Sequence, residues 1–168
     1  MEHFATQQIN VVDTTPSMMK ALLAAQLLEK VPSLQLVVLG GEELPAELWD
    51  HLAATGLEVV NAYGPTESTV DALLARVEPG VAHLGRPVAG MRAYLVDNAL
   101  QLVGDQEVGE LVLAGPQLAL GYRGLPEATD AAFKEDVRID PRRAPERIYR
   151  TGDLSLIHIS EPTRRTPI

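Results

Sequence analysis

Apolar residues in the first 75 positions alternate between short continuous runs and a helical spacing. Residues 9–12 and 34–41 are nearly unbroken apolar runs, which predict strands of a parallel sheet, the second one covered on both faces. Residues 16–30 repeat apolar side chains every three or four positions, and residues 45–55 form a second helical segment. With residues 57–64 as a third strand, this order predicts right-handed crossovers and a parallel sheet.

Capping and helix-breaking residues indicate where these helices begin and end. Thr15 before Pro16 is a cap and first-turn pair, so a helix should begin there. The Val-Pro-Ser stretch at residues 31–33 should end that helix, and Gly56 should end the second one.

The pattern changes after residue 75. Residues 92–115 contain short β-type runs separated by Asp97-Asn98, Gly104-Asp105 and Gly109, which predicts a β-meander or barrel. Further on we expect a short helix over residues 126–133, a charged loop over 134–147 and a last strand over 147–154 that ends in a turn. The predicted fold is therefore α/β over residues 1–75, as a βαβαβ part, followed by a barrel-like β subdomain over residues 76–154.

Composition narrows the class of protein. The 168 residues are 46% hydrophobic with a net charge of −9, which favours a packed core and argues against a nucleic-acid partner. The chain has no cysteine, and its four histidines are too scattered for a metal held by protein alone. Neither a signal-peptide pattern nor an apolar run of membrane-span length is present, so a cytoplasmic location with no membrane contact is expected.

Unusual residues follow each predicted strand of the parallel sheet, where ligands bind in such folds. Asp13 follows the first strand and Gly40-Gly41-Glu42 the second, and residues 61–67 follow the third. In this last loop, Tyr63 offers a ring for stacking on a base. Glu67 offers a carboxylate for a magnesium ion otherwise held by phosphate and water. Taken alone, each of these residues is better explained by a turn and a capped helix start.

Four motifs in order resemble one known family. NAYGPTE at residues 61–67 resembles the signature of the adenylate-forming enzymes, most closely the adenylation domains of nonribosomal peptide synthetases. LVVLGGEELP at 36–45, GELVLAGPQLALGY at 109–122 and YRTGDL at 149–154 match further motifs of that family. The resemblance covers residues 9–154, and four ordered motifs are far more specific than one.

The resemblance implies roles for individual residues. Tyr63 would stack on adenine, Asn61 would lie near its amino edge, and the glycine backbone at 40 and 41 would pack against the ring. Asp153 would accept hydrogen bonds from the ribose hydroxyls. Thr66 and Glu67 would act in catalysis, on the phosphates and on Mg²⁺ respectively. The full nucleotide-binding set implied is Gly40, Gly41, Glu42, Asn61, Ala62, Tyr63, Gly64, Thr66 and Asp153.

The implied reaction is attack by an amino-acid carboxylate on ATP, giving an aminoacyl-adenylate and pyrophosphate, with transfer to a phosphopantetheine thiol of a carrier domain. Carrier and condensation domains would be the partners. An acyl- or aryl-coenzyme A ligase is the alternative enzyme. A catalytically inert remnant that binds nucleotide or a partner is the alternative of another class. A dinucleotide-binding enzyme is disfavoured because no Gly-x-Gly-x-x-Gly follows a strand.

The side-chain pocket implied by the resemblance contains two carboxylates, Asp13 and Asp71, in a small and otherwise apolar lining. Such carboxylates need a partner, so we expect a basic amino acid such as arginine, ornithine or lysine, with glutamine or glutamate second. An Asp71 side chain that faces solvent is the alternative. The pocket positions are Asp13, Val38, Gly40, Ala62, Val70 and Asp71.

Several positions depart from the family or carry no expected role. Leu120 stands where the family usually has arginine, and the motif around it is expected to be mainly structural. Trp49 is expected to pack, and His83 to be a loop residue. The solvated arginines are expected to be Arg123, Arg142 and Arg143.

The two ends of the chain depart from the family pattern. The upstream phosphate loop and the downstream hinge and lysine are absent, so we expect this polypeptide to be a fragment that is inactive alone. Residues 154–164 are similar to the translation of a transposon-end sequencing adapter. We therefore expect residues 155–168 to be a non-native, disordered tail, with no function for His158, Arg164 or Arg165.

Overall fold

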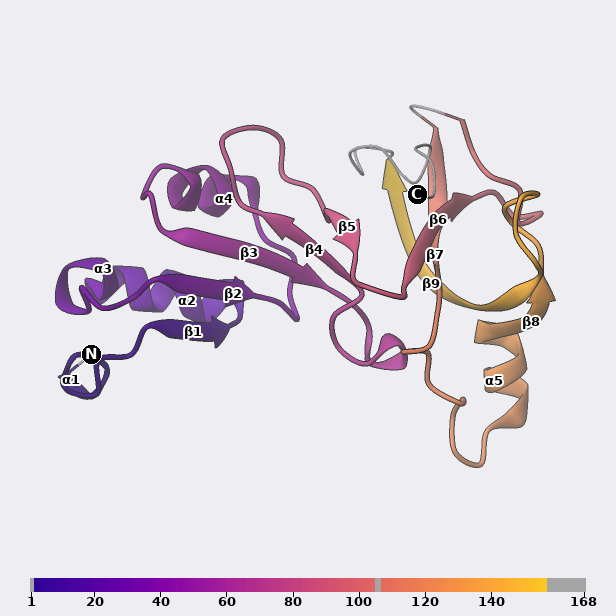
Figure 1. Cartoon of the computed structure of the whole chain (residues 1–168), viewed down its shortest axis with the longest axis horizontal. Coiled ribbons are helices and arrows are strands. Elements are labelled where there is room, and N and C mark those ends of the chain that lie inside the picture. Colours follow the sequence, from indigo (N-terminus) through magenta and orange to yellow (C-terminus); the bar gives the residue numbers. More distant parts are fainter. Residues whose placement is uncertain (1, 105–106, 157–168) are drawn as a thin grey trace. The chain divides into compact units, whose positions relative to one another are not determined.

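The structure is a computed structural model that describes residues 2–104 and 107–156. The described part of the chain divides into two compact units, of which the first contains residues 2–63 and 74–85 and the second contains residues 64–73, 86–104 and 107–156 (Figure 1). The chain therefore crosses between the two units three times, after residues 63, 73 and 85, rather than once near residue 75 as predicted. The loop that follows the third strand belongs to the second unit, while the next strand returns to the first.

The first unit is an α/β fold with parallel strands, as predicted. Its sheet runs in the order β1-β2-β3-β4, and β1, β2 and β3 pair in parallel. Hydrophobic residues align across the strands, with Val37 opposite both Val12 and Val59. The elements are α1 (Glu2–Thr6), β1 (Val11–Thr14), α2 (Pro16–Ala24), α3 (Leu27–Lys30), β2 (Leu36–Leu39), α4 (Ala46–Ala53), β3 (Glu58–Tyr63) and β4 (Leu73–Arg76).

Helix boundaries follow the predicted caps with one exception. The Thr15 side chain accepts a hydrogen bond from the Met18 N–H and caps α2, and Gly56 takes a left-handed conformation beyond α4. The predicted single helix over residues 16–30 is wrong. It is divided into α2 and α3 because Gln26 has a φ of 64°, which no α-helix can contain. The α1 helix was not predicted.

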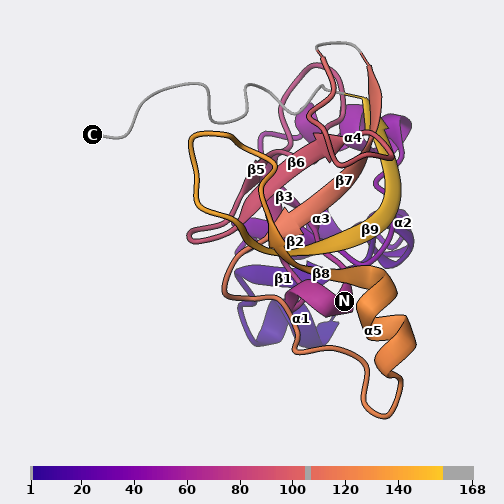
Figure 2. The same ribbon diagram turned by 90° about the vertical axis from the view of Figure 1, so that its right-hand side faces the viewer.

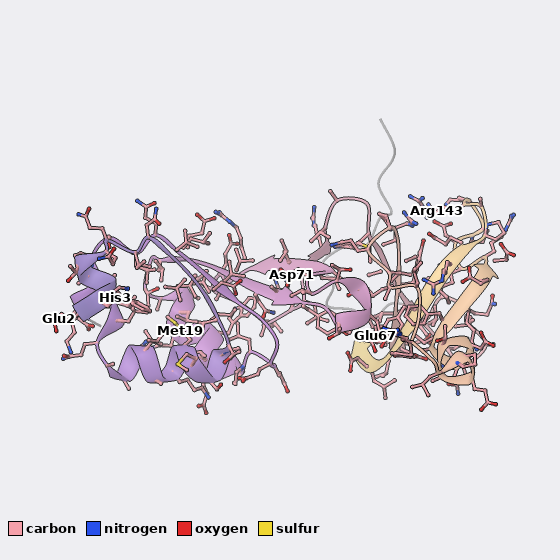
Figure 3. The ribbon with its side chains drawn as sticks, turned by 90° about the horizontal axis from the view of Figure 1, so that it is seen from below. Glu2, His3, Met19, Glu67, Asp71 and Arg143 are labelled. Atoms are coloured by element: carbon pink, nitrogen blue, oxygen red, sulfur yellow. The ribbon has the colours of Figure 1, made fainter. Side chains whose placement is uncertain are left out.

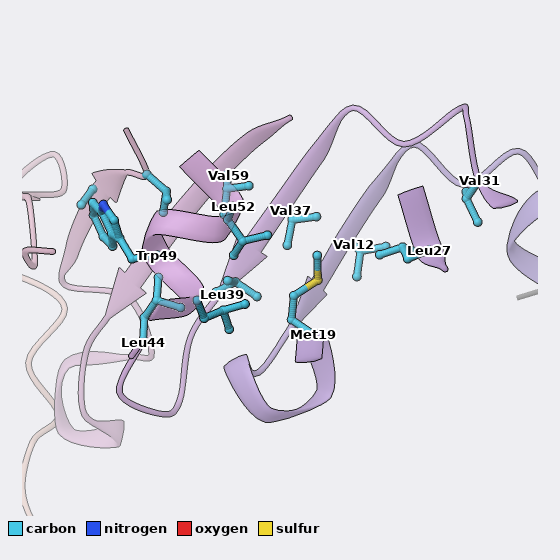
Figure 4. Close-up of a cluster of buried hydrophobic side chains, with 13 residues drawn as sticks. Val12, Met19, Leu27, Val31, Val37, Leu39, Leu44, Trp49, Leu52 and Val59 are labelled. Carbon is cyan, nitrogen blue, oxygen red and sulfur yellow. The ribbon is translucent and has the colours of Figure 1, made fainter. Parts of the chain in front are cut away.

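The core of the first unit lies between its helices and one face of the sheet (Figure 4). Val37 and Leu39 are fully buried, whereas Leu36 and Val38 are partly exposed, so the described residues bury one face of β2 rather than the predicted two. Trp49 is 1% exposed and donates its indole N–H to the Glu78 carbonyl at 2.9 Å, which confirms that it packs.

The second unit is built on an antiparallel sheet in the order β6-β7-β9-β8, as the meander pattern predicted (Figure 2). Among the described residues the pairing ends at β6 and β8. The elements are η1 (Thr66–Ser68), β5 (Arg86–Pro87), β6 (Arg92–Val96), β7 (Val108–Ala114), α5 (Pro126–Ala132), β8 (Phe133–Val137) and β9 (Glu146–Leu156).

Three local predictions in the second unit are corrected. Gly109 lies inside β7 rather than in a turn. A Cβ there would be 3.0 Å from the Val96 nitrogen on the neighbouring strand, so glycine lets the two strands approach. Part of the predicted charged loop is β8, which pairs with β9. The last strand does not end at Leu154 but continues through Leu156. The remaining predicted tail, residues 157–168, lies outside the described residues.

Candidate functional site

The carboxyl ends of the parallel strands bring predicted site residues of the first unit together. Asp13 pairs in register with Val38, and Leu39 pairs with Asn61 on the other side. The Gly40 N–H donates to the Thr14 carbonyl at 3.1 Å, which extends the β1–β2 pairing beyond the strand ends. The Asp13 side chain is exposed at this edge.

Glycine is required at the two positions after β2 for different reasons. A Cβ on Gly40 would lie 3.2 Å from the Ala62 carbonyl oxygen, so the absence of a side chain lets the two segments approach. Gly41 has open space around it but a φ of +78°, which glycine adopts without strain. Contact between this backbone and an adenine ring remains a prediction.

Glu42 joins the loop after β2 to the start of α2. Its carboxylate accepts a hydrogen bond from the Ser17 N–H at 3.0 Å and another from the Ser17 hydroxyl at 2.8 Å. The hydroxyl contact and then the N–H contact lower the pKa of Glu42 below its ordinary value. The structure therefore gives Glu42 an anchoring role that the motif did not reveal, and its contact with nucleotide remains a prediction.

Asn61 is held inside the first unit. It is 7% exposed, and its amide nitrogen donates to the His83 carbonyl at 3.1 Å. The His83 ring lies 5.3 Å from the Trp49 ring, so a residue predicted to be an ordinary loop residue contacts both the core and a predicted site residue. Tyr63 is partly buried at the end of β3.

The loop over residues 64–73 carries the predicted site residues of the second unit that follow β3. It folds back so tightly that a Cβ on Gly64 would be 2.1 Å from the Val70 carbonyl oxygen. Ser68 is fully buried and donates its hydroxyl to the Pro65 carbonyl at 3.0 Å. Thr66 is exposed on η1.

The end of this loop has an unusual backbone. Thr69 and Val70 have φ values of 59° and 71°, a region that β-branched residues avoid. The Thr69 hydroxyl donates to the Gln117 carbonyl at 2.7 Å and so holds the loop on the segment that follows β7. Val70 is 68% exposed, and Asp71 is partly exposed.

Glu67 is the most constrained charged residue of the loop, and Figure 3 labels it together with Asp71. The Tyr122 hydroxyl donates to Glu67 Oε1 at 2.5 Å, and the Ala119 N–H donates to the Glu67 carbonyl at 2.7 Å. The Tyr122 hydrogen bond is the main reason why the pKa of Glu67 lies below its ordinary value. Glu67 is therefore ionised at neutral pH, as a ligand for a divalent cation must be.

Asp153 lies on a bulge in β9, where the pairing register with β7 shifts. The Thr151 hydroxyl donates to the Leu111 carbonyl at 2.7 Å, and the Gly152 N–H donates to Glu110 Oε1 at 3.2 Å. The Asp153 N–H donates to Thr151 Oγ1 at 3.0 Å, and its side chain is exposed. The predicted terminal turn is thus a bulge within a continuing strand.

The structure groups the predicted site residues into three sets. The first unit presents the strand ends with Asp13, Val38, Gly40, Gly41, Glu42, Asn61, Ala62 and Tyr63. The second unit presents one loop with Gly64, Thr66, Glu67, Val70 and Asp71, and separately the bulge with Asp153. Sequence reasoning missed Ser17, His83 and Tyr122. Of these, the final tyrosine of GELVLAGPQLALGY was visible but expected to be structural.

The described residues contain neither a cluster of metal-ligating side chains nor a helix that could span a membrane. Within residues 2–104 and 107–156, no three His, Cys, Asp or Glu side chains gather in a way that could hold a metal ion. No helix in this part of the chain is both long and apolar enough to span a membrane.

Comparison with known proteins places the chain among enzymes that bind AMP. Residues 1–123 match the model of a family described as AMP-binding enzyme. The chain is 39% identical over 142 residues to the dapdiamide synthesis protein DdaD of Enterobacter agglomerans, covering 84% of this chain and 23% of that protein.

Solved structures give the same result. The nonribosomal peptide synthetase FmoA3 in its alpha-methyl-L-serine-AMP bound form is 29% identical with a TM-score of 0.77, covering 91% of this chain and 18% of that one. A nonribosomal peptide synthetase protein containing adenylation and PCP domains is 27% identical with a TM-score of 0.78, covering 90% and 27%. The chain thus spans less than a third of the length of each of these proteins.

Proposed function

Because the chain belongs to the AMP-binding enzyme family, we propose that it is part of an amino-acid-activating adenylation domain of a nonribosomal peptide synthetase. The whole domain would join an amino acid to AMP and release pyrophosphate. The observation that carries the proposal is the loop over residues 64–73, in which the Tyr122 hydroxyl holds the Glu67 carboxylate and the Ala119 N–H holds the Glu67 carbonyl. By its resemblance to the signature of that family, this loop would lie next to the phosphates of ATP.

The residues of the chain would bind and orient the nucleotide. The Tyr63 ring would stack on adenine, the exposed Thr66 hydroxyl would contact the phosphates, and the exposed Asp153 carboxylate would accept from the ribose hydroxyls. Glu67 would supply one oxygen ligand to Mg²⁺, which neutralises phosphate charge when it is bound with ATP.

The reaction needs positioning more than a protein nucleophile. A carboxylate oxygen of the amino acid attacks the α-phosphorus, the bond from that phosphorus to the bridging oxygen breaks, and pyrophosphate leaves with the electron pair. In the second step the phosphopantetheine thiol loses its proton to a base. Its sulfur then bonds to the acyl carbon and AMP leaves. The carrier domain that offers this thiol, with a condensation domain, would be the partner in the full-length protein.

The substrate side chain is proposed to be basic. Asp13 stands exposed at the end of β1 beside Val38, and Asp71 ends the strained part of the second unit's loop, so each carboxylate has access to a ligand. Arginine, ornithine or lysine would neutralise these charges, and glutamine or glutamate comes second. Pyrophosphate exchange by a complete adenylation domain that contains this chain should be faster with arginine than with leucine, and equal rates would contradict a pocket for a basic side chain.

Isothermal titration calorimetry with ATP and Mg²⁺ tests the nucleotide site on the 168-residue chain. Wild type should bind ATP, and Tyr63→Ala should weaken binding by roughly tenfold, because a base stacked on an aromatic ring contributes about 1–3 kcal/mol. Tyr63→Phe keeps the ring and should retain the affinity. If ATP does not bind, the chain is an inert remnant and the proposed nucleotide site fails. If ATP binds equally well to Tyr63→Ala, the stacking role of Tyr63 fails.

A further inference from the structure

Tyr122 lies in the segment after β7, to which the proposed function gives no role. It contacts Glu67, the residue proposed to bind Mg²⁺. The two residues are 55 positions apart, and the Tyr122 hydroxyl donates to Glu67 Oε1 at 2.5 Å.

The loop that carries Glu67 is held on the same segment at two further points. The Ala119 N–H donates to the Glu67 carbonyl, and the Thr69 hydroxyl donates to the Gln117 carbonyl, each at 2.7 Å. Together with the Tyr122 contact, these bonds fix the backbone of the loop and the side chain of Glu67 from one side.

Tyr122 is itself held in place by its surroundings. Its N–H donates to Thr129 Oγ1 on α5 at 2.8 Å, and its ring meets the Phe133 ring edge-on at 5.9 Å. Glycine at position 121 permits this packing, because a Cβ there would lie 2.4 Å from Thr129 Cγ2. The hydroxyl is therefore presented from a fixed backbone.

We propose that Tyr122 is a positioning residue for the magnesium site, whose hydroxyl orients the Glu67 carboxylate toward the metal. A carboxylate has about four lone-pair sites, so a hydroxyl on Oε1 is compatible with a metal ligand on the same group. Because the carboxylate is already held in one orientation, less side-chain entropy is lost when the metal binds. This inference rests on the proposed function, because it assumes that Glu67 meets the Mg²⁺ of a bound nucleotide.

The test compares ATP affinity in excess Mg²⁺ with ATP affinity in EDTA, by calorimetry on the 168-residue chain. Tyr122→Phe removes the hydroxyl and keeps the ring against Phe133. It should reduce the ratio of the two affinities by about tenfold, as the loss of a residue that supports a metal ligand does, and leave the EDTA affinity unchanged. Tyr94→Phe is the matched control, because the Tyr94 hydroxyl donates to a different carboxylate, Glu146 Oε1, at 2.8 Å. Its ratio should equal that of wild type.

The outcomes separate this inference from the function on which it rests. Wild type without ATP binding, or without strengthening by Mg²⁺, overturns both together. If Mg²⁺ strengthens ATP binding to Tyr122→Phe as much as to wild type, the positioning role alone is overturned. An equal loss of ATP affinity with and without Mg²⁺ also overturns it, because that is the effect of a purely structural residue. If Tyr122→Phe does not fold, Thr129→Ala removes the acceptor for the Tyr122 N–H together with the hydroxyl's bond to the Leu125 carbonyl, and the same outcomes apply to it.

Discussion

Gly64 and Val70 lie at the two sides of a loop that closes on itself, and a Cβ at position 64 would be 2.1 Å from the Val70 carbonyl oxygen. Because the nearest atom belongs to the backbone, no side-chain rotation relieves the clash. The glycine of the NAYGPTE motif is therefore explained by the local packing of the loop, independently of any ligand. The same closure places Glu67 at the tip, where it meets Tyr122.

We expect Gly64→Ala to destabilise the second unit by about 1–3 kcal/mol, because the loop must open to admit the methyl group. Urea unfolding followed by circular dichroism measures the change. Gly104→Ala is the control, because its Cβ would meet only the flexible Glu107 side chain, at 3.4 Å, and its cost should stay within about 0.5 kcal/mol. Equal costs for the two variants would contradict the packing explanation.

Val70 tests whether the loop stores backbone strain. With a φ of 71° and 68% exposure, it gives up few contacts on truncation, so Val70→Gly should stabilise the chain by about 0.5–1 kcal/mol. Val81 is equally exposed, at 71%, with an ordinary φ, and Val81→Gly should instead destabilise by about 0.5–1 kcal/mol because glycine has more backbone freedom to lose. The opposite signs of the two free-energy changes are the result to look for, and a loss of stability in both variants would remove strain as an explanation.

The Glu42–Ser17 contact predicts a pH dependence of stability. Folding lowers the pKa of Glu42 from its ordinary value of 4.5, so the contact stabilises the chain fully above that pH. The stabilisation is lost as the pH falls through the lower value in the folded chain. Glu42→Gln should therefore flatten the decline of the free energy of unfolding below pH 4.5, measured by urea titration at several pH values. Ser17→Ala should have the same effect, and combining the two should add little, whereas fully additive changes would show that the residues act separately.

The sequence was sufficient for the βαβαβ order of the first unit, because each element there carries its own signal. Thr15 before Pro16 marks a helix start that the structure reproduces, and Gly56 marks a helix end. The break at Gln26 has no such signal, since glutamine favours helix and the apolar spacing continues through it. In the second unit, Lys134 to Val137 form a strand because β9 supplies hydrogen-bonding partners, which a local reading of charged residues cannot reveal.

The candidate site shows the same division between local and distant information. The positions of Asp13, Gly40 and Asn61 follow from where parallel strands end, so the pattern alone predicts that they gather at one edge. The contact between Glu67 and Tyr122 joins residues 55 positions apart, one on η1 and the other in the segment between β7 and α5. Neither periodicity nor turn chemistry specifies such a pair, and only the structure shows the contact.

Arg147 carries the last prediction, because it supports the segment on which Glu67 rests. Its guanidinium donates to the Ala119 and Leu120 carbonyls at 2.6 and 3.0 Å and lies 4.4 Å from the centre of the Phe133 ring. A lysine ammonium cannot reproduce this planar arrangement, so Arg147→Lys should destabilise the chain by about 1–2 kcal/mol in urea unfolding.

The ion pair of Arg147 with Glu135 provides the control for this variant. The Glu135 side chain is 68% exposed, and a pair of this kind contributes little in water, so Glu135→Gln should cost less than about 0.5 kcal/mol. The Ala119 carbonyl accepts from Arg147, and the Ala119 N–H donates to the Glu67 carbonyl. Arg147→Lys should therefore also weaken the Mg²⁺ dependence of ATP binding. A Glu135→Gln variant as unstable as Arg147→Lys would show instead that the ion pair, and not the carbonyl contacts, holds the arginine.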